Sequence, residues 1–446
     1  MAEKTPLKRI PDSPALTSPP AESNVTNQDP IDFEEIEGEI EVTSPETYAG
    51  HLVEWATDRH ASDLFLSDDQ RSVVIAVRVM GRIEIVRRLA RDYGNRLQGH
   101  FRAIAGANAG DLVHPTEGRA VLATEDGREV DFRLSAIPTL FGQDVSIRLF
   151  DSSRSQQGIH GLGLDDAEVE MLKRLLDHPS GLILVSGPVA SGKTCTLYSA
   201  LHYLNDGSRK IHTIEDPVEY AIRGVHQSQV NLRARLDYND LLTAVLRHSP
   251  DVIMIGEIRD ASIAATAVRA GSSGQLVLAT VHSDSAAQAI SIMRQYEANS
   301  SFLARTLVGV VNQRLVKRLC PECREEIACG DELIGNERVR QRLAGTPPKL
   351  YRAGSGDACF NTGFDSLTCL PELLYVTPEI ERAIVEGESA MELERLATEG
   401  GMLTLADTAE ARILQGVTTP AEICRELDAP QLAHLIARYR DAERSE

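Results

Sequence analysis

Apolar and polar residues alternate along two neighbouring segments with the period of two that half-buried β-strands require. In REVDFRLSAI, Val130, Phe132 and Leu134 form one apolar face, and QDVSIRLF repeats the alternation. The pattern predicts two strands joined as a hairpin through IPTLFGQD. Arg133 and Arg148 then share the polar face of the hairpin. On periodicity alone, this face is most simply a solvated surface with ordinary ion pairs.

The pattern upstream predicts the rest of a first globular unit, residues 47–152. YAGHLVEWATDRHASDLFL is typical of a helix that leads into a strand. VVIAVRVMGRIEIV predicts two alternating strands around a turn at Met80 and Gly81. A helical stretch separates these strands from the hairpin, so we expect a small unit of mixed strands and helices.

Three further regions follow this unit, and one precedes it. Strands and helices alternate over residues 153–318, as in α/β nucleotide-binding domains. Residues 319–375 contain most of the cysteines and show little regular pattern, and residues 376–446 predict a small helical region. Residues 1–46 are rich in proline and acidic side chains, so we expect a disordered tail. Its segment IDFEEIEGEIEV also suits a short docking element.

Residues 187–194 read GPVASGKT, a complete G-x-x-x-x-G-K-S/T phosphate-binding loop. The apolar run LILV precedes the loop and the helical segment TLYSALHYL follows it, so a buried strand delivers the loop to a helix N-terminus. Gly187 and Gly192 permit backbone angles that wrap amides around a phosphate. Lys193 supplies charge to the phosphate oxygens, and the Thr194 hydroxyl can bind Mg²⁺. The other residues of the loop are Pro188, Val189, Ala190 and Ser191. The loop predicts binding of a nucleoside triphosphate.

Three more predicted strands end in acidic or imidazole side chains. KIHTIEDPVEY ends with Glu215, Asp216 and Glu219, DVIMIGEIRD ends with Glu257, and QLVLATVHSD ends with His282. In parallel sheets, ligands bind at the carboxyl ends of strands. We therefore expect these side chains to converge on the nucleotide.

Glu257 is the best candidate for the carboxylate that orients or deprotonates the attacking water. It follows four apolar residues and Gly256, which allows close approach, and a capping glutamate at the surface is the alternative. His282 is either a structural histidine or a sensor of the γ-phosphate, and its place at a strand end favours sensing. Acidic groups around Mg²⁺ and the water are also needed, and the candidates are Glu215, Asp216 and Glu219.

Composition restricts the class of protein. The chain has 446 residues with 42% hydrophobic content, enough for several domains with real cores. The sequence contains neither an apolar run of about 18 residues nor a signal peptide, so we expect a soluble, cytoplasmic protein. A formal net charge of −20 disfavours a free nucleic-acid-binding protein. The close pair Cys320 and Cys323 suggests a metal site before a disulfide.

Four motifs carry a resemblance to a known family. In order and spacing, GPVASGKTCTLY, TIEDPVEY, RHSPDVIMIGEIRD and QLVLATVHSD closely resemble motifs of the hexameric ATPases of bacterial type II secretion and type IV pilus assembly, the GspE/PilB-type motors. ASDLFL, PTEGR, DFRLSAIPTLFGQDVSIRLF, VVNQRLVKRLCPEC and CFNTGF extend the match over residues 47–375.

The resemblance implies a PAS-like α+β N-terminal domain joined to a RecA-like ATPase domain, with ATP and Mg²⁺ as cofactors. It implies a homo-hexamer that acts on an inner-membrane platform protein of a secretion or pilus system. The acidic net charge is the reason why we expect no nucleic-acid partner. Membrane association would then be peripheral and through partners. It also implies that Arg133 and Arg148 reach the γ-phosphate as arginine fingers, where charge neutralisation contributes strongly to phosphoryl transfer.

The chain departs from the family pattern at several positions. Val189 and Ala190 stand where the family usually has Thr-Gly, and alanine tolerates a left-handed conformation poorly. Nucleotide affinity or loop geometry can therefore differ from that of relatives. Gln275 replaces the first histidine of the family's histidine box, and Asp365-Ser366-Leu367 replaces a Gly-Arg segment.

The cysteine region also departs from the family, whose members hold a structural zinc ion with two CxxC pairs. Cys320 and Cys323 match the first pair, and Cys359 matches the second member of the second pair, but its partner position is Gly356. A four-coordinate Zn²⁺ site therefore needs another ligand. The nearest candidates in the sequence are Cys369, Cys329 and Asp357. Free thiols without a metal are an equal alternative.

We interpret the chain as a hexameric, cytoplasmic, Mg²⁺-dependent ATPase that powers assembly of a type II secretion pseudopilus or a type IV pilus. A pilus-retraction motor is one alternative, which the short N-terminal region favours and the cysteine region disfavours. A catalytically weak regulatory paralogue is another, because Val189, Ala190 and the incomplete cysteine set would suit it. The acidic balance disfavours a nucleic-acid translocase.

Overall fold

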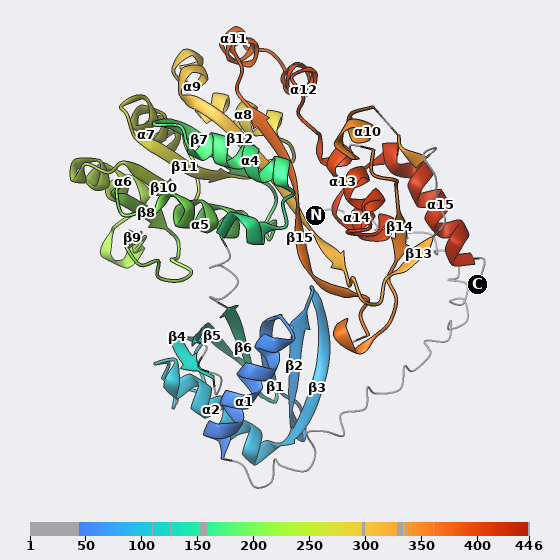
Figure 1. Cartoon of the computed structure of the whole chain (residues 1–446). Helices are drawn as coiled ribbons and strands as arrows, with labels where there is room; N and C mark the ends of the chain where they lie inside the picture. The colour runs from blue at the N-terminus through green and yellow to red at the C-terminus, as the bar shows by residue number, and fades with distance from the viewer. Residues whose placement is uncertain are drawn as a thin grey trace, which may run out of the picture. The chain divides into compact units, whose positions relative to one another are not determined.

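The computed structural model describes residues 44–444, except for 109, 125–126, 128, 152–157, 297–298, 328–332, 336, 344 and 360 (Figure 1). The expected tail, residues 1–46, lies outside the described residues apart from its last three. Two large β-sheets organise the described part of the chain.

The first sheet has six antiparallel strands in the order β3-β2-β1-β6-β5-β4. The strands are β1 (Ala61–Asp68), β2 (Ser72–Val79), β3 (Arg82–Ala90), β4 (Thr116–Ala123), β5 (Glu129–Thr139) and β6 (Gly142–Asp151). Helices α1 (Pro45–Asp58) and α2 (Arg91–Ile104) pack against the sheet. The apolar faces expected from the alternating segments are confirmed, because Val130, Phe132 and Leu134 are all buried.

The turns of this sheet also follow the sequence. Met80 (φ 47°) and Gly81 (φ 79°) join β2 to β3 with two left-handed residues, as a tight hairpin requires. The predicted pairing of β5 with β6 is confirmed, although the turn is shorter than expected, since Thr139 already pairs with Gly142. Strand β4 was not predicted. Within it, a Cβ at Gly118 would lie 2.3 Å from the Ala105 carbonyl oxygen, so this position requires glycine.

The second sheet has seven strands in the order β15-β12-β7-β11-β10-β8-β9. They are β7 (Gly181–Ser186), β8 (Ile211–Glu215), β9 (Val225–Gln229), β10 (Val252–Ile255), β11 (Leu276–Val281), β12 (Leu307–Leu319) and β15 (Phe364–Tyr375). All neighbours pair in parallel except β12 and β15, which are antiparallel. The predicted α/β pattern is therefore confirmed, and the carboxyl ends of β7, β8, β10 and β11 lie at one edge.

Successive residues of the parallel strands enter two different hydrophobic cores, one on each face of the sheet. Ile253 and Ile255 belong to the first core, whereas Val252 and Met254 belong to the second. The first core contains residues of α6 (Tyr238–Val245), α7 (Ala261–Ser272), α8 (Ala286–Tyr296), α9 (Ser300–Thr306), α11 (Pro378–Glu386) and α12 (Ala390–Glu399). The second contains residues of η1 (Gly158–Leu162), α4 (Asp166–Leu176) and α5 (Lys193–Leu204).

A third core gathers the cysteine-containing region and the end of the chain. It combines Val316 of β12 and Leu370 of β15 with residues of several short elements. These elements are α10 (Glu337–Leu343), β14 (Leu350–Arg352), α13 (Leu405–Leu414), α14 (Pro420–Glu426) and α15 (Ala433–Arg444), and β13 (Glu325–Ile327) pairs with β14. The helices predicted after residue 376 are present, and they divide between this core and the core of the parallel sheet.

Candidate active site

The phosphate-binding loop connects β7, buried along its whole length, to the N-terminus of α5. Gly187 (φ 144°) and Gly192 (φ 87°) both adopt conformations that favour glycine. A Cβ at Gly187 would lie 2.5 Å from the Gln313 carbonyl oxygen, so the loop passes too close to β12 for a side chain. Ala190 is left-handed (φ 64°), the conformation that the sequence suggested would be difficult here. Val189 beside it is exposed.

Lys193 and Thr194 begin α5 at the mouth of the loop. The Lys193 Nζ donates to the carbonyl oxygens of Gly187 (2.9 Å) and Pro188 (2.7 Å). Burial lowers the pKa of the Lys193 ammonium, and the nearby Glu257 carboxylate opposes that shift. The Thr194 side chain is exposed at the first turn of the helix. An ammonium and a hydroxyl therefore border the same loop, as binding of a metal-bound phosphate requires.

His282 connects the phosphate-binding loop to Glu257. Its Nδ1 lies 3.5 Å from the Lys193 Nζ and 3.3 Å from the Gly187 carbonyl oxygen, and its Nε2 lies 3.1 Å from the Glu257 Oε1. The residues come from the ends of β7, β10 and β11, three neighbouring strands. The structure thus brings together an ammonium, an imidazole and a carboxylate that are far apart in the sequence.

The second oxygen of Glu257 accepts from Arg259, with Nε to Oε2 at 2.7 Å. The same guanidinium lies 3.4 Å from Asp216 through its Nη1, so Arg259 joins the ends of β8 and β10. Gly256 lets the strands approach, because a Cβ there would lie 2.9 Å from the Tyr238 hydroxyl. Glu257 keeps partial exposure, with 23% of its side chain accessible, so water can reach the carboxylate.

Glu215 differs from the other acidic candidates because it lies in the interior. Its carboxylate accepts from the hydroxyls of Tyr198 and Thr213 and from the Gln227 side-chain amide, and it is 3% exposed. Burial and the neighbouring Glu215 carboxylate raise the pKa of Tyr198 far above its ordinary value, so this phenol remains a donor. Glu215 therefore stabilises the end of β8 through buried hydrogen bonds.

Three arginines form a row across the first sheet. Arg119 on β4 pairs in register with Arg133 on β5, which pairs with Arg148 on β6. The expected common face of Arg133 and Arg148 is therefore confirmed, and Arg119 extends it. The Arg148 Nε donates to Asp63 Oδ1 at 3.1 Å, so this guanidinium is held within the first sheet.

Arg119 and Arg133 contact the segment that follows β8, and the Arg119 guanidinium also pairs with Asp131 of β5 within the first sheet. The Arg119 guanidinium donates to the carbonyl oxygens of Val218 (3.2 Å) and Glu219 (2.6 Å). Arg133 donates to the same Val218 oxygen, and its Nη1 lies 3.3 Å from the Glu219 carboxylate. Burial raises the pKa of Glu219, and the arginines oppose that shift. Sequence reasoning gave Arg119 no role, although it ends the quoted PTEGR motif.

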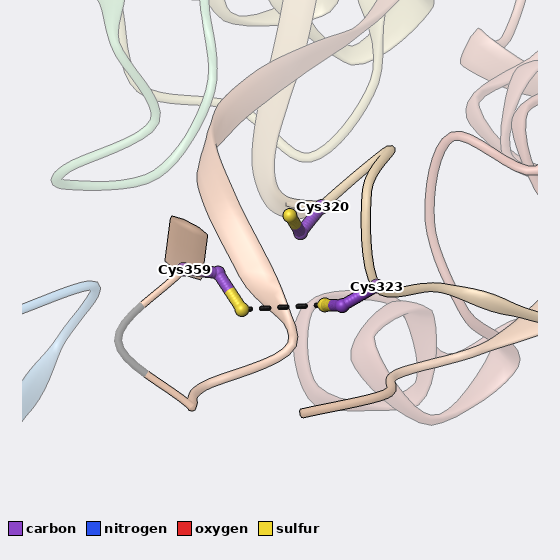
Figure 2. A group of neighbouring side chains, drawn as sticks. All are labelled: Cys320, Cys323 and Cys359. Atoms are coloured by element: carbon purple, nitrogen blue, oxygen red, sulfur yellow. Dashed lines mark hydrogen bonds between the residues drawn. The ribbon is translucent and has the colours of Figure 1, made fainter. Parts of the chain in front are cut away.

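Three cysteines form a separate cluster (Figure 2). The Sγ atoms of Cys320, Cys323 and Cys359 all lie within 4.8 Å of one another, with Cys323 and Cys359 3.3 Å apart. Burial raises the pKa of the Cys323 thiol to about 12. For Cys359, hydrogen bonds from Cys323 and the Gly363 amide outweigh burial and lower the thiol pKa. Three soft sulfur ligands in this arrangement can hold a metal ion.

The candidates for a fourth ligand are not all in reach of the cluster. Cys369 is fully buried within β15, where its electrostatic neighbours are Glu168 and Arg412, and it is absent from the cluster formed by the described residues. Cys329 lies outside the described residues, and Asp357 begins the short helix η5 (Asp357–Cys359). At Gly356, a Cβ would lie 3.3 Å from the Cys323 Cβ, so a side chain here would face the cluster.

Comparison with known proteins agrees with this geometry. The model of the type II/IV secretion system protein family matches residues 43–425. Type II secretion system protein E of Dickeya dadantii is 34% identical over 370 residues, which cover 83% of this chain and 73% of that protein. Type IV pilus assembly ATPase PilB of Thermus thermophilus is 33% identical over 386 residues, covering 86% of this chain and 43% of that protein.

Solved structures show the same fold. The pilus retraction motor PilT with bound ADP aligns with a TM-score of 0.58 and 24% identity, covering 85% of this chain and 97% of that one. The ATPase DotB of Legionella pneumophila aligns with a TM-score of 0.63 and 18% identity, covering 86% of this chain and 95% of that one. At these identities the likeness concerns the fold.

Proposed function

The chain belongs to the type II/IV secretion system protein family and is an ATP-hydrolysing enzyme, and from that premise we propose how its residues act. We propose that it powers assembly of a type II secretion pseudopilus or a type IV pilus, and relatives named type II secretion system protein E and type IV pilus assembly ATPase PilB support this. The observation that supports this proposal best is the pair of contacts that His282 makes with Lys193 and Glu257. These contacts join the phosphate-binding loop to a carboxylate across three strands.

We assign the first role to the phosphate-binding loop, residues 187–194. Its amides and the Lys193 ammonium would hold the β- and γ-phosphates, and Lys193 would exchange its present carbonyl partners for phosphate oxygens. Thr194 would hold Mg²⁺, which neutralises phosphate charge when bound. The exposed hydroxyl of Thr194 at the start of α5 fits such a ligand.

We assign water activation to Glu257. One carboxylate oxygen contacts His282 and the other contacts Arg259, so both oxygens are held in place while each keeps a second lone pair and the side chain stays partly exposed. His282 would report the presence of a γ-phosphate to Glu257, because it touches Lys193 and Glu257 with its two ring nitrogens. Asp216 would orient Arg259 from the end of β8.

We assign charge neutralisation to the arginine row. Arg119 and Arg133 already contact residues 218 and 219, close in sequence to Asp216. Rotation of these guanidinium groups toward a bound γ-phosphate would supply positive charge to the transition state. Arg148 is held by Asp63, so its participation requires that ion pair to open.

The central test is ATP turnover by the purified chain, compared with Lys193→Ala and Glu257→Gln. We expect Lys193→Ala to lose nucleotide binding, and Glu257→Gln to bind ATP while turnover falls at least about a hundredfold. Lys173→Ala, on α4, is the matched control for the lysine, since its ion pair with Glu170 is exposed. If wild-type protein turns over ATP no faster than the two site variants, the assignment of ATP hydrolysis to Lys193 and Glu257 is refuted.

The strained Ala190 favours a second candidate, a catalytically weak paralogue whose nucleotide binding regulates assembly. In that case wild-type protein would bind ATP tightly but turn it over no faster than Glu257→Gln. The same assay therefore separates the two functions. A retraction-type motor would instead turn over ATP normally, and complementation of pilus extension or retraction would identify it.

We propose that the three-cysteine cluster holds Zn²⁺, with the fourth position taken by a group other than Cys369. Metal analysis of purified protein should find about one zinc per chain. Cys323→Ser should lose the metal, whereas Cys424→Ser, at an exposed cysteine outside the cluster, should keep it. Gly356→Cys should tighten zinc binding, because its side chain would face Cys323. Wild-type protein free of metal would contradict the assignment.

The larger organisation follows from the family. We propose a homo-hexamer that docks on an inner-membrane platform protein, with residues 47–152 as a PAS-like unit, 153–318 as a RecA-like core, 319–375 as a cysteine subdomain and 376–446 as a helical region. The central position of β1 beside β6 in the first sheet supports the PAS-like assignment. None of the described helices has the length and apolar character needed to cross a bilayer. Light scattering with ATP would measure the oligomeric state.

A further inference from the structure

Strand β12 contains three consecutive polar residues that are almost completely buried. Asn312, Gln313 and Arg314 are 0%, 1% and 6% exposed, in a strand whose other residues are mostly apolar. Burying an amide or a guanidinium is unfavourable unless each polar group finds a partner. The partners of these side chains therefore show what the segment does.

Gln313 contacts the phosphate-binding loop. Its Nε2 donates to the Ser191 carbonyl oxygen at 2.7 Å, and its Oε1 accepts from the Thr196 hydroxyl at 2.8 Å. Asn312 accepts from the Ser186 hydroxyl at 3.1 Å, immediately before the loop. Both ends of the phosphate-binding loop are thus fixed to β12.

The same strand holds the loop that carries His282. The Asn312 Nδ2 donates to the Asp284 carbonyl oxygen at 3.1 Å. The Arg314 Nη2 lies 3.2 Å from that oxygen and 3.3 Å from Asp284 Oδ1. Burial lowers the pKa of Arg314, with Asp284 opposing the shift, and the guanidinium is held inside the protein while its carboxylate partner is exposed.

Glu372 on β15 connects this arrangement to the C-terminal helices. It pairs in register with Asn312 and is 3% exposed. Its Oε1 accepts from the amide of Ala286, the first residue of α8, at 2.8 Å. Burial raises the pKa of Glu372, and the backbone amide of Leu405, the first residue of α13, opposes that shift, while the Thr408 hydroxyl of α13 donates to the carbonyl oxygen of the neighbouring Pro371 at 2.9 Å. The buried carboxylate therefore caps α8 directly after the His282 loop and acts electrostatically on the first turn of α13, which is bonded to β15 at the neighbouring residue.

We infer that Arg314 and Glu372 are positioning residues that hold the His282 loop against the phosphate-binding loop and transmit its position to α13. The inference deepens the proposed function, since it acts through His282. A merely structural role would predict that their substitution lowers stability, nucleotide affinity and turnover together. A positioning role predicts a selective loss of turnover, because small displacements of reacting groups slow chemistry more than binding.

The first test uses Arg314→Lys in the full chain, with Arg318→Lys, at an exposed position of the same strand, as the matched control. Lysine keeps the charge, but its single Nζ cannot replace both the Nη2 contacts with Asp284 and the Nη1 bond to the Gln313 carbonyl oxygen. We expect kcat to fall about tenfold while KM for ATP and the affinity for a non-hydrolysable analogue change less than about threefold. Equal losses of affinity and kcat, or an unchanged kcat, would overturn the inference.

A companion variant protects the test against misfolding. Asp284→Asn changes a side chain that is 85% exposed, and it removes the ion pair while leaving the backbone contacts of Asn312 in place. A fall in kcat of about threefold at unchanged thermal stability is expected. Unchanged kcat in this variant counts against the role of Arg314 even if Arg314→Lys cannot be purified.

The link to α13 has a readout that does not depend on turnover. In wild-type protein, binding of a non-hydrolysable ATP analogue should slow hydrogen–deuterium exchange in residues 283–290 and in residues 405–410. Glutamine keeps an oxygen for the Ala286 amide but lacks the second acceptor oxygen and the charge of the carboxylate, so in Glu372→Gln the first effect should remain and the second should disappear, whereas Glu386→Gln, at an exposed site on α11, should keep both. Equal nucleotide protection of α13 in wild type and Glu372→Gln would overturn the link. If wild-type protein binds ATP but does not hydrolyse it, the proposed function is refuted. The exchange measurement still tests the link to α13, because it requires only nucleotide binding.

Discussion

Ala190 is the residue where the phosphate-binding loop departs most from the conformation its side chain prefers. Its φ of 64° is left-handed, which costs an alanine about 1 kcal/mol relative to glycine. Contacts of the residues beside Ala190 therefore maintain the conformation of the loop, and one of them is the hydrogen bond from Gln313 to the Ser191 carbonyl oxygen. Strain of this kind at a binding loop is tolerated only when surrounding contacts enforce it.

We expect Ala190→Gly to relieve this strain. The free energy of unfolding should rise by up to about 1 kcal/mol, less the greater backbone entropy of glycine in the unfolded chain. Val189→Ala is the control, because Val189 is exposed and is not left-handed, and it should leave stability within about 0.5 kcal/mol. Urea denaturation measures both changes. A destabilised Ala190→Gly would mean that the φ of Ala190 stores no strain.

Glu215 and Asp216 are adjacent in sequence but have different surroundings, so they should respond differently to truncation. Glu215→Ala leaves the donors of Tyr198, Thr213 and Gln227 without their buried acceptor, and should lower the free energy of unfolding by about 3 kcal/mol. Asp216→Ala removes one partly exposed ion pair and should cost less than about 1 kcal/mol. Equal stability of the two variants would place Glu215 among the exposed groups of the site.

At the scale of elements, the strands with strong apolar patterns were predictable, as was the alternating edge strand β3, whereas the edge strands β4 and β9 were not. β5, β6, β7 and β10 present continuous or alternating apolar residues because at least one face is buried. β4 and β9 close the ends of the two sheets, and their side chains are mostly half-buried or exposed. An edge strand needs few apolar residues, so its sequence resembles a loop.

The residues of the candidate site also fall into two groups, those that could be predicted from the sequence and those that could not. Lys193, Glu257 and His282 were predictable because each lies in the segment after a buried parallel strand, and such strand ends meet at one edge. Gln313 and Arg119 were not, since the contacts of Gln313 with Ser191 and Thr196 and those of Arg119 with residues 218 and 219 span 99 or more residues, and no local pattern encodes them. Glu215 is the last residue of the apolar strand β8, and Glu257 comes two residues after β10, so the two look alike in the sequence. The hydroxyls of Tyr198 and Thr213, however, bind the Glu215 carboxylate in the protein interior.

The pairing of β8 with β9 produces a pH dependence at the opposite end of these strands. His212 on β8 pairs in register with His226, and its ring lies 4.8 Å from that of His226 and 5.8 Å from that of His248. Burial lowers the pKa of His212 to about 4, and the positive charges of His226, Lys210 and His248 act in the same direction. The folded-state pKa is below the unfolded one, so the neutral form is stabilised by folding.

The stability due to neutral His212 is therefore complete above about pH 6.5 and is lost as pH falls toward 4. We expect His212→Leu to reduce the loss of unfolding free energy between pH 7 and pH 4.5 by about 2 kcal/mol. His160→Leu, at an exposed histidine in η1, should not alter the pH profile. Denaturation at a series of pH values is the measurement, and parallel profiles for wild type and His212→Leu would refute the assignment.

At the scale of the whole described chain, a buried ionic network joins segments that are more than 200 residues apart. Arg412 of α13 donates to Glu168 of α4, and its Nη1 lies 3.3 Å from Asp165 Oδ2. Arg342 of α10 lies 3.2 Å from the other Glu168 oxygen and also pairs with Asp165. The helices after residue 404 are thus connected to the helix that precedes the phosphate-binding strand.

Removing one member of this network leaves an oppositely charged member buried with fewer partners, which lowers the free energy of unfolding. Arg412 and Glu168 have side chains only 5% and 7% exposed, and burial raises the pKa of Glu168. Arg412→Met would leave the Glu168 carboxylate buried with Arg342 as its remaining cation, and should lower the free energy of unfolding by about 3 kcal/mol. Arg425→Met, whose side chain is 52% exposed in its pair with Glu422, should cost less than about 1 kcal/mol.

The double variant Arg412→Met/Glu168→Gln decides whether the cost comes from the stranded charge. Neutralising Glu168 removes the uncompensated carboxylate, so the double variant should be more stable than the sum of the single changes by about 1–2 kcal/mol. Strict additivity would mean that Arg412 contributes through packing alone. Because Thr408 of α13 is also bonded to Pro371 of β15, the coupling energy from this cycle would further show how firmly the C-terminal helices are held to the nucleotide-binding sheet.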